Sequence, residues 1–324
     1  MQTNTFFRKW LWILISVILY AGCAPIHPSS VNTQITLAPL SITLQSASIP
    51  KTTSVPTFTT SPTLTSTITP TSRPTLTADE QKNYVTELVN TNTGCQLPCW
   101  WAIVPGKTTW KETESFMRYL GVSIGQRETE SGVIWRPLFV KGLLREFDIS
   151  FVASKEGVIN TIFIAGNPGA TQKQEDFESF WETYSPKEVI RIYGVPSRVL
   201  LSAPGQTGIG NTGNNGYILW IFYDHLGFMI RYDGAVADLP IYHFCPELKE
   251  GANNVISIDF TLQHPDHALP LELSDGILAH YLWRVKSIQD ATGMSLEEFH
   301  QLFSQDEKPA CFDTPHDIWP VVQP

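Results

Sequence analysis

Hydrophobic and polar residues alternate along several stretches of this chain, and this alternation predicts its strands. Phe147, Ile149 and Phe151 alternate with Asp148 and Ser150, so that one set of side chains faces a core and the other faces away. Comparable strand signals lie at 133–140, 158–165, 217–224, 228–232, 241–244 and 256–262. They form two groups, each of which we expect to be an antiparallel sheet.

Apolar residues at helical spacing precede each group of strands. In the first copy, Thr109 and Glu112 have the spacing of a capping box that opens a helix. In the second copy, Ser185 stands at the cap, Pro186 at the first helical position and Glu188 at the third. The repeated order predicts two copies of the same unit.

The chain is therefore expected to have an α+β fold with two tandem helix–helix–antiparallel-sheet modules, at 79–169 and 170–324. The second module should end in C-terminal helices. One is indicated behind Ser274, and Ser295 and Glu298 predict the start of another by their capping-box spacing. The first of these has a helical stripe that comprises Ile277, Leu278, Tyr281, Leu282, Val285 and Ile288.

The first 22 residues have the pattern of a secretory signal peptide. Arg8 and Lys9 precede an apolar run at 10–20, which is shorter than the roughly 20 residues that span a bilayer as a helix. The small residues before Cys23 resemble the lipobox of bacterial lipoproteins. The resemblance implies cleavage before Cys23, a lipid on its thiol, and a protein held at the extracytoplasmic face of a bacterial cell membrane.

Residues 23–78 read as a disordered tether. In 51–78, 20 of the 28 residues are Thr, Ser or Pro, and such a stretch has too few apolar side chains to offset the entropy of ordering. Its Pro residues favour an extended, polyproline-like chain. The tether would hold the folded part away from the lipid.

Charged residues are distributed unevenly along the chain. Of 22 basic residues, four lie in 1–78, where there is no acidic residue; the remaining 18 accompany all 31 acidic ones, a net charge of −13 for 79–324. Phosphate binding needs a positive surface. We therefore expect no nucleic-acid partner.

Four cysteines remain once Cys23 is assigned to the lipid, and an even number in an exported chain indicates disulfides. Three pairings are possible. We favour Cys95–Cys99, because these residues are neighbours around a Pro turn, together with Cys245–Cys311. A redox-active Cys95–Cys99 pair and a four-cysteine zinc site are the alternatives.

Few residues have the arrangement of a chemical site. His264, Asp266 and His267 could bind a metal through two imidazoles and a carboxylate. The sequence has no Gly-x-Ser-x-Gly elbow, His-Glu-x-x-His motif or phosphate-binding loop. We therefore assign no catalytic residue and expect no cofactor.

Trp100 and Trp101 are the best candidates for a binding contact, because two neighbours on an extended strand cannot both point inward. One of them should be at the surface, unless the segment is irregular and buried on both sides. Exposed aromatic rings beside carboxylates would suit a sugar.

Two resemblances bear on function. A capped helix that ends at Gly194-Val195-Pro196, followed by a strand hairpin at 217–232, resembles the modules of beta-lactamase-inhibitor-like proteins and of small outer-membrane assembly lipoproteins of the SmpA/OmlA type. The run from Cys95 to Thr108 is similar to a C-x-x-P-C-W-W-x-x-x-P-G-x-T signature of uncharacterised bacterial lipoproteins. The first resemblance implies a binding or envelope-scaffold protein without catalytic activity, whose partner would be an envelope protein or a glycan. A surface carbohydrate-binding protein and a hydrolase with an unrecognised, metal-dependent site are the alternatives.

Overall fold

A computed structural model describes the folded part of the chain. The described residues are 76–129, 132–138, 147–168, 174–203, 216–236, 241–248, 255–267, 270–274, 278, 284–305 and 309–319. The predicted signal peptide, Cys23 and the predicted tether up to residue 75 lie outside this set.

The structure is of the α+β class, as predicted. Its main helices are α2 (Ala78–Thr91), α3 (Trp110–Tyr119), α4 (Gln174–Trp181), α5 (Pro186–Tyr193) and α9 (Leu296–Phe303). Shorter helical segments are η1 (Asn92–Gly94), η2 (Glu182–Tyr184), α6 (Leu271–Ser274), α8 (Ile288–Thr292) and η4 (His316–Ile318).

The predicted helix starts are confirmed at three caps. Thr109 and Glu112 form both hydrogen bonds of a capping box at α3, and Ser295 opens α9 in the same way. Ser185 accepts the backbone N–H of Glu188 at α5. These caps depend on atoms only three residues apart, which is why the sequence could predict them.

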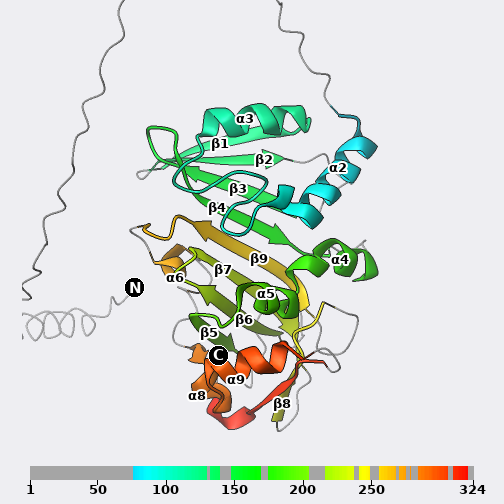
Figure 1. Cartoon of the computed structure of the whole chain (residues 1–324), viewed down its shortest axis with the longest axis vertical. Coiled ribbons are helices and arrows are strands. Elements are labelled where there is room, and N and C mark those ends of the chain that lie inside the picture. The colour runs from blue at the N-terminus through cyan, green and yellow to red at the C-terminus, as the bar shows by residue number, and fades with distance from the viewer. Residues whose placement is uncertain are drawn as a thin grey trace, which may run out of the picture. The chain divides into compact units, whose positions relative to one another are not determined.

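Nine strands form one antiparallel sheet in the order β1-β2-β3-β4-β9-β7-β6-β5-β10 (Figure 1). Their bounds are β1 (Ser123–Thr129), β2 (Gly132–Leu138), β3 (Phe147–Ala153), β4 (Ile159–Gly166), β5 (Arg198–Ser202), β6 (Gly216–Tyr223), β7 (Phe228–Ala235), β9 (Val255–Gln263) and β10 (Lys286–Ser287). A separate two-stranded ribbon pairs β8 (Ile241–Phe244) with β11 (Phe312–Pro315).

The sheet has two halves with mirrored strand order. Two helices and then four successive antiparallel strands make the first half, β1 to β4. The second half runs β5, β6, β7, β9, and its last strand pairs with β4, from Thr161 opposite Gln263 to Gly166 opposite Ile258. The strands of 79–169 and 170–324 therefore share one sheet.

The structure differs from the sequence-based expectation in several details. Each group of strands was expected to form its own sheet, whereas one sheet contains both groups, and β5 and β11 were not among the predicted strands. The edge strand β1 was not predicted, because its residues are mostly polar, none is buried, and they show no alternation of apolar and polar positions. The expected strand at 241–244 lies in the ribbon instead of the main sheet. The predicted helical stripe does not continue from Val285 to Ile288, because Lys286–Ser287 form β10 and Ser287 then caps α8.

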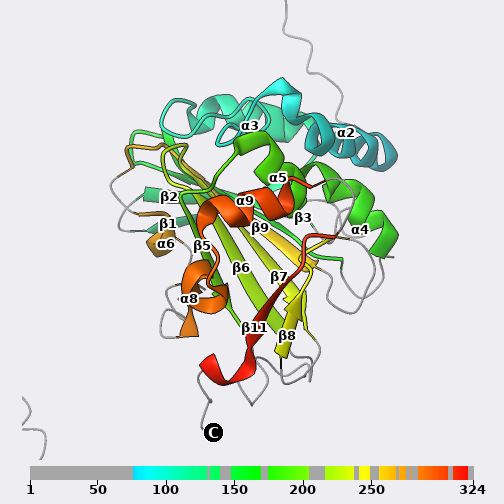
Figure 2. The same ribbon diagram turned by 60° about the horizontal axis from the view of Figure 1, so that its bottom comes forward.

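Helices α2, α3, α4, α5 and α9 cover one face of the sheet (Figure 2). Beneath them, aromatic rings from both halves meet at the β4–β9 seam: Phe260 of β9 contacts Trp100 with ring centroids 5.6 Å apart and Trp181 at 5.7 Å. Gly166 has no side chain where the Trp181 indole packs on β4. The core is thus shared between the halves.

The opposite face of the second half is covered in part by the segment around α6. There Trp220, Phe222 and Met229 pack with Leu271 and Leu278 in a smaller apolar cluster. Beside this cluster, the Arg231 side chain forms ion pairs with Asp233 and Asp259 and is only 10% exposed.

Candidate functional site

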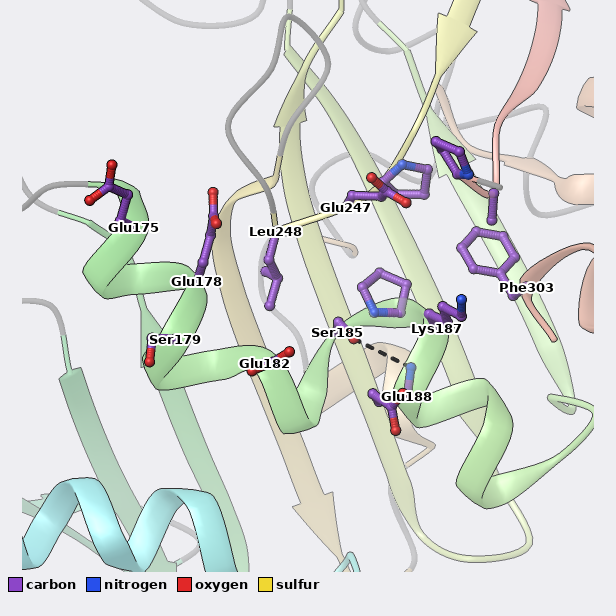
Figure 3. Close-up of a pocket in the computed structure, with 14 residues that line it drawn as sticks. Glu175, Glu178, Ser179, Glu182, Ser185, Lys187, Glu188, Glu247, Leu248 and Phe303 are labelled. Atoms are coloured by element: carbon purple, nitrogen blue, oxygen red, sulfur yellow. Dashed lines mark hydrogen bonds between the residues drawn. The ribbon is translucent and has the colours of Figure 1, made fainter. Parts of the chain in front are cut away.

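A groove with a volume of about 710 Å³ lies between α4, α5 and the chain segments that flank the β8–β11 ribbon (Figure 3). Its walls come from three parts of the sequence. The lining residues are Glu175, Glu178, Ser179, Glu182, Ser185, Pro186, Lys187, Glu188, Pro246, Glu247, Leu248, Phe303, Pro309 and Ala310.

The first wall is the acidic side of α4 and η2. Phe177, Trp181 and Tyr184 are buried against the sheet. The helical period then places Glu178 and Glu182, four residues apart, on the side that faces away from this core. The local amphipathic pattern is therefore what directs these carboxylates into the groove.

The start of α5 forms the second wall. The backbone N–H of Glu188 donates to the Ser185 hydroxyl at 3.3 Å, which fixes the first turn of the helix (Figure 3). The Glu188 carboxylate forms an ion pair with Arg191 at 2.6 Å. The charge of this glutamate is therefore partly balanced within its own helix.

The third wall consists of the residues after β8 and before β11. Glu247 donates its backbone N–H to the Cys245 carbonyl at 2.7 Å, and its own carbonyl accepts the Val255 N–H at 2.8 Å. The Cys245–Cys311 disulfide ties this segment to the segment that carries Pro309 and Ala310. The wall is therefore held covalently.

The groove is strongly acidic. Five of its lining residues are glutamates and one is a lysine. One carboxylate oxygen, Oε1 of Glu178, is buried and has no hydrogen-bond partner among the described residues. A buried acceptor without a donor is costly, whereas the other glutamates of the groove can pair with a ligand that brings positively charged donors.

Apolar surface lies beside these carboxylates. Leu248, Phe303 and Ala310 also line the groove and are themselves almost fully buried. Lys and Arg side chains combine an alkyl stem with a charged head. The groove therefore matches both parts of such a side chain.

The predicted metal ligands are not assembled into one site. His264 Nδ1 accepts the backbone N–H of Asp266 at 3.2 Å, and the His267 N–H donates to the His264 carbonyl. His264 Nδ1 lies 3.8 Å from Asp266 Oδ2, but His267 does not join them in a group of three. In the described part of the chain, the group of three whose ligand atoms all lie within 4.8 Å of one another is His243, Cys245 and Cys311. Two of these are joined in a disulfide, and the thiolate is the form of cysteine that binds metals.

Neither Trp100 nor Trp101 lies at the surface, and the exception stated above holds, because their segment is irregular and buried. Both are buried, with exposures of 0% and 3%. Trp101 and Ala102 have φ values of 54° and 65°, and this left-handed turn is closed by two backbone hydrogen bonds between Trp100 and Ile103. The turn breaks the alternation of a strand, so both indoles enter the core.

The disulfides of the structure are Cys95–Cys99 and Cys245–Cys311, the pairing that we favoured. No tryptophan or tyrosine among the described residues is exposed. Tyr84, Tyr119, Trp135 and Tyr193 are partly exposed, and the other tryptophans and tyrosines of the described residues are buried.

Sequence reasoning missed the acidic groove. One local signal was available: Glu175, Glu178 and Glu182 recur at helical spacing between the aromatic residues of 177–184. This pattern could have indicated a helix with one acidic side and one aromatic side. Glu247 lies 65 positions after Glu182 in the sequence, and no local pattern connects the two.

Within the described residues, no helix is long and apolar enough to cross a membrane. Comparisons of the chain with protein-family models, with curated proteins and with solved structures find no match.

Proposed function

We propose that this protein is a non-catalytic binding protein of the bacterial envelope, held at the extracytoplasmic face of the membrane by a lipid on Cys23. Its acidic groove binds a Lys- or Arg-containing segment of an envelope protein. The observation that supports this role is the groove itself, which glutamates of 175–188 and Glu247 line together with apolar side chains.

The composition of the groove favours a cationic peptide over a sugar or a hydrolysed substrate. Charged donors can pair with the glutamates that line the groove. Electrostatic attraction between opposite surfaces also raises the rate of association. The carbohydrate and hydrolase alternatives have no comparable feature among the described residues.

A peptide-binding measurement tests this function. A labelled octalysine peptide is titrated with the purified protein, and its affinity is followed by fluorescence anisotropy. We expect the double variant Glu178→Gln/Glu182→Gln to bind about tenfold more weakly, which corresponds to about 1.4 kcal/mol. The affinity of the unchanged protein should also fall as salt is added, because salt screens these charges.

The matched control is Asp79→Asn/Glu87→Gln, which likewise removes two carboxylates, both exposed on α2, a helix that does not line the groove. It should bind the peptide as the unchanged protein does. Equal losses in the control and in the groove variant Glu178→Gln/Glu182→Gln would mean that only overall charge matters. No loss in the groove variant would rule out the groove as the peptide site.

A further inference from the structure

A second cluster of reactive side chains lies on the β8–β11 ribbon. Asp313 on β11 lies opposite His243 on β8. Cys245 directly follows β8 and Cys311 directly precedes β11, and a disulfide joins these two cysteines. Residues two apart on a strand share a face, so these four side chains share the outer face of the ribbon. The inner face has the buried residues Tyr242, Phe244, Phe312 and Thr314.

The contacts on the outer face form a chain from a carboxylate to a sulfur. Asp313 Oδ1 lies 2.6 Å from His243 Nδ1, and His243 Nε2 lies 3.2 Å from Cys245 Sγ. An ionised carboxylate can only accept a hydrogen bond, so the Nδ1 atom carries a proton. The Nε2 atom is thereby directed at the disulfide.

We propose that Cys245–Cys311 is a thiol–disulfide exchange site, in which an external thiol attacks Cys311 and His243 assists the departure of the Cys245 sulfur. The reactant is a small-molecule thiol or a protein thiol. This inference does not depend on what the acidic groove binds.

The exchange is balanced in atoms and electrons. The thiolate of the external thiol forms a bond to Cys311 Sγ, and the Cys245–Cys311 S–S bond breaks. The electron pair of that bond leaves on Cys245 Sγ, which takes the Nε2 proton of the His243 imidazolium. The products are a mixed disulfide on Cys311, a thiol at Cys245 and a neutral imidazole.

The position of His243 favours this step because negative charge develops on Cys245 as the bond breaks. A disulfide sulfur is a weak acceptor, whereas a thiolate is charged and accepts strongly. The Nε2 contact therefore stabilises the transition state more than the ground state, which is the requirement for catalysis. Better stabilisation of the leaving thiolate speeds exchange.

Asp313 is a positioning residue in this arrangement. Its carboxylate accepts the Nδ1 hydrogen bond and holds the imidazole ring in place, without contact to the sulfur atoms that react. Its own side chain is 61% exposed, and that of His243 is 52% exposed. A thiol from solution can therefore reach this face of the ribbon.

The Cys95–Cys99 disulfide is an internal control for the Cys245–Cys311 disulfide. All four bridged cysteines are partly exposed. Among the described residues, no histidine forms a hydrogen bond to the sulfur of Cys95 or Cys99. The two bridges differ in the neighbouring imidazole, so their rates can be compared within one molecule.

The experiment measures the reduction of each bridge by glutathione in the full-length protein. Samples are quenched in acid at intervals, free thiols are alkylated, and peptide mass spectrometry gives the rate at each bridge and the cysteine that carries glutathione. For His243→Gln we expect the rate at Cys245–Cys311 to fall about a hundredfold, the lower end of what a positioned acid contributes. The rate at Cys95–Cys99 should not change.

The site of modification gives a second readout, which a loss of packing would not produce. In the unchanged protein the mixed disulfide should form on Cys311, and His243→Gln should remove this preference. Asp313→Asn should slow exchange by a smaller factor, and His316→Gln, a nearby histidine whose ring lies 5.0 Å from Tyr242, should leave the rate unchanged.

Three results would overturn the proposal. These are an unchanged rate in His243→Gln, glutathione distributed equally between the two cysteines of the unchanged protein, or an equal change at both bridges. If His243→Gln fails to fold, as judged by circular dichroism, Asp313→Asn decides: slower exchange supports the proposal and an unchanged rate rejects it.

Discussion

At the scale of single residues, the structure places charge in two unlike environments on the same sheet. Arg231 on β7 forms ion pairs with Asp233 at 3.1 Å and with Asp259, and its side chain is only 10% exposed. Ser257 donates to Asp233 at 3.0 Å and completes this cluster. Arg136 on β2 instead pairs with Asp148 where both side chains are well exposed, at 60% and 42%.

Because of these different environments, replacing Arg231 should lower the free energy of unfolding more than replacing Arg136. Arg231→Met would leave two partly buried carboxylates without their cation, and we expect the free energy of unfolding to fall by about 3–5 kcal/mol. Arg136→Met removes an exposed pair and should cost less than about 1 kcal/mol. Urea unfolding followed by tryptophan fluorescence measures both.

A double variant checks the reason for this difference. Asp259→Asn added to Arg231→Met removes one of the carboxylates that lost the Arg231 guanidinium, so it should restore part of the lost stability. If Arg231→Met and Arg136→Met cost the same, burial does not control the strength of these pairs.

At the scale of elements, the seam between β4 and β9 connects the two halves. Ile162 pairs with Leu262, and Ile164 pairs with Phe260. The Phe260 ring contacts Trp100 from the first half, and Trp181 and Tyr184 from the second. A core that continues across this seam should make the halves unfold together.

Phe260→Ala tests this coupling. Removal of the ring from the shared core should lower the free energy of unfolding by about 3–5 kcal/mol. Hydrogen exchange measured by mass spectrometry should show faster exchange in β3 of the first half as well as in β6 of the second. Faster exchange in β6 alone, or two separate unfolding transitions, would instead indicate that 79–169 and 170–324 are independent modules.

At the scale of the whole molecule, the proposed function needs the folded part to be held at a membrane. The pattern around Cys23 favours a lipid anchor, and the Thr-, Ser- and Pro-rich composition of 51–78 favours a spacer. Such a tether would raise the local concentration of the acidic groove near other envelope proteins.

The anchor leads to a separate prediction about Cys23. When the full chain is expressed in bacteria fed labelled palmitate, Cys23→Ser should abolish incorporation of the label and release the protein from the membrane fraction. Thr77→Ser, a change outside the signal, is the control and should keep both. Label that persists in Cys23→Ser would rule out this cysteine as the lipid site.

The sequence by itself determined the features that depend on neighbouring residues. The α+β class followed from period-2 strands and capped helices, because Thr109 and Glu112, or Ser185 and Glu188, interact across three residues. The net charge of −13 for residues 79–324 likewise required no structure.

Tertiary structure decided where those elements meet. The left-handed turn at Trp101 and Ala102 buried two indoles that an extended strand would have separated. The groove joins Glu178 to Glu247, and the ribbon brings His243 beside Asp313, 70 residues away. Such contacts depend on strand pairing and on packing in a shared core, whose energies involve residues far apart in the chain, so no local pattern specifies them.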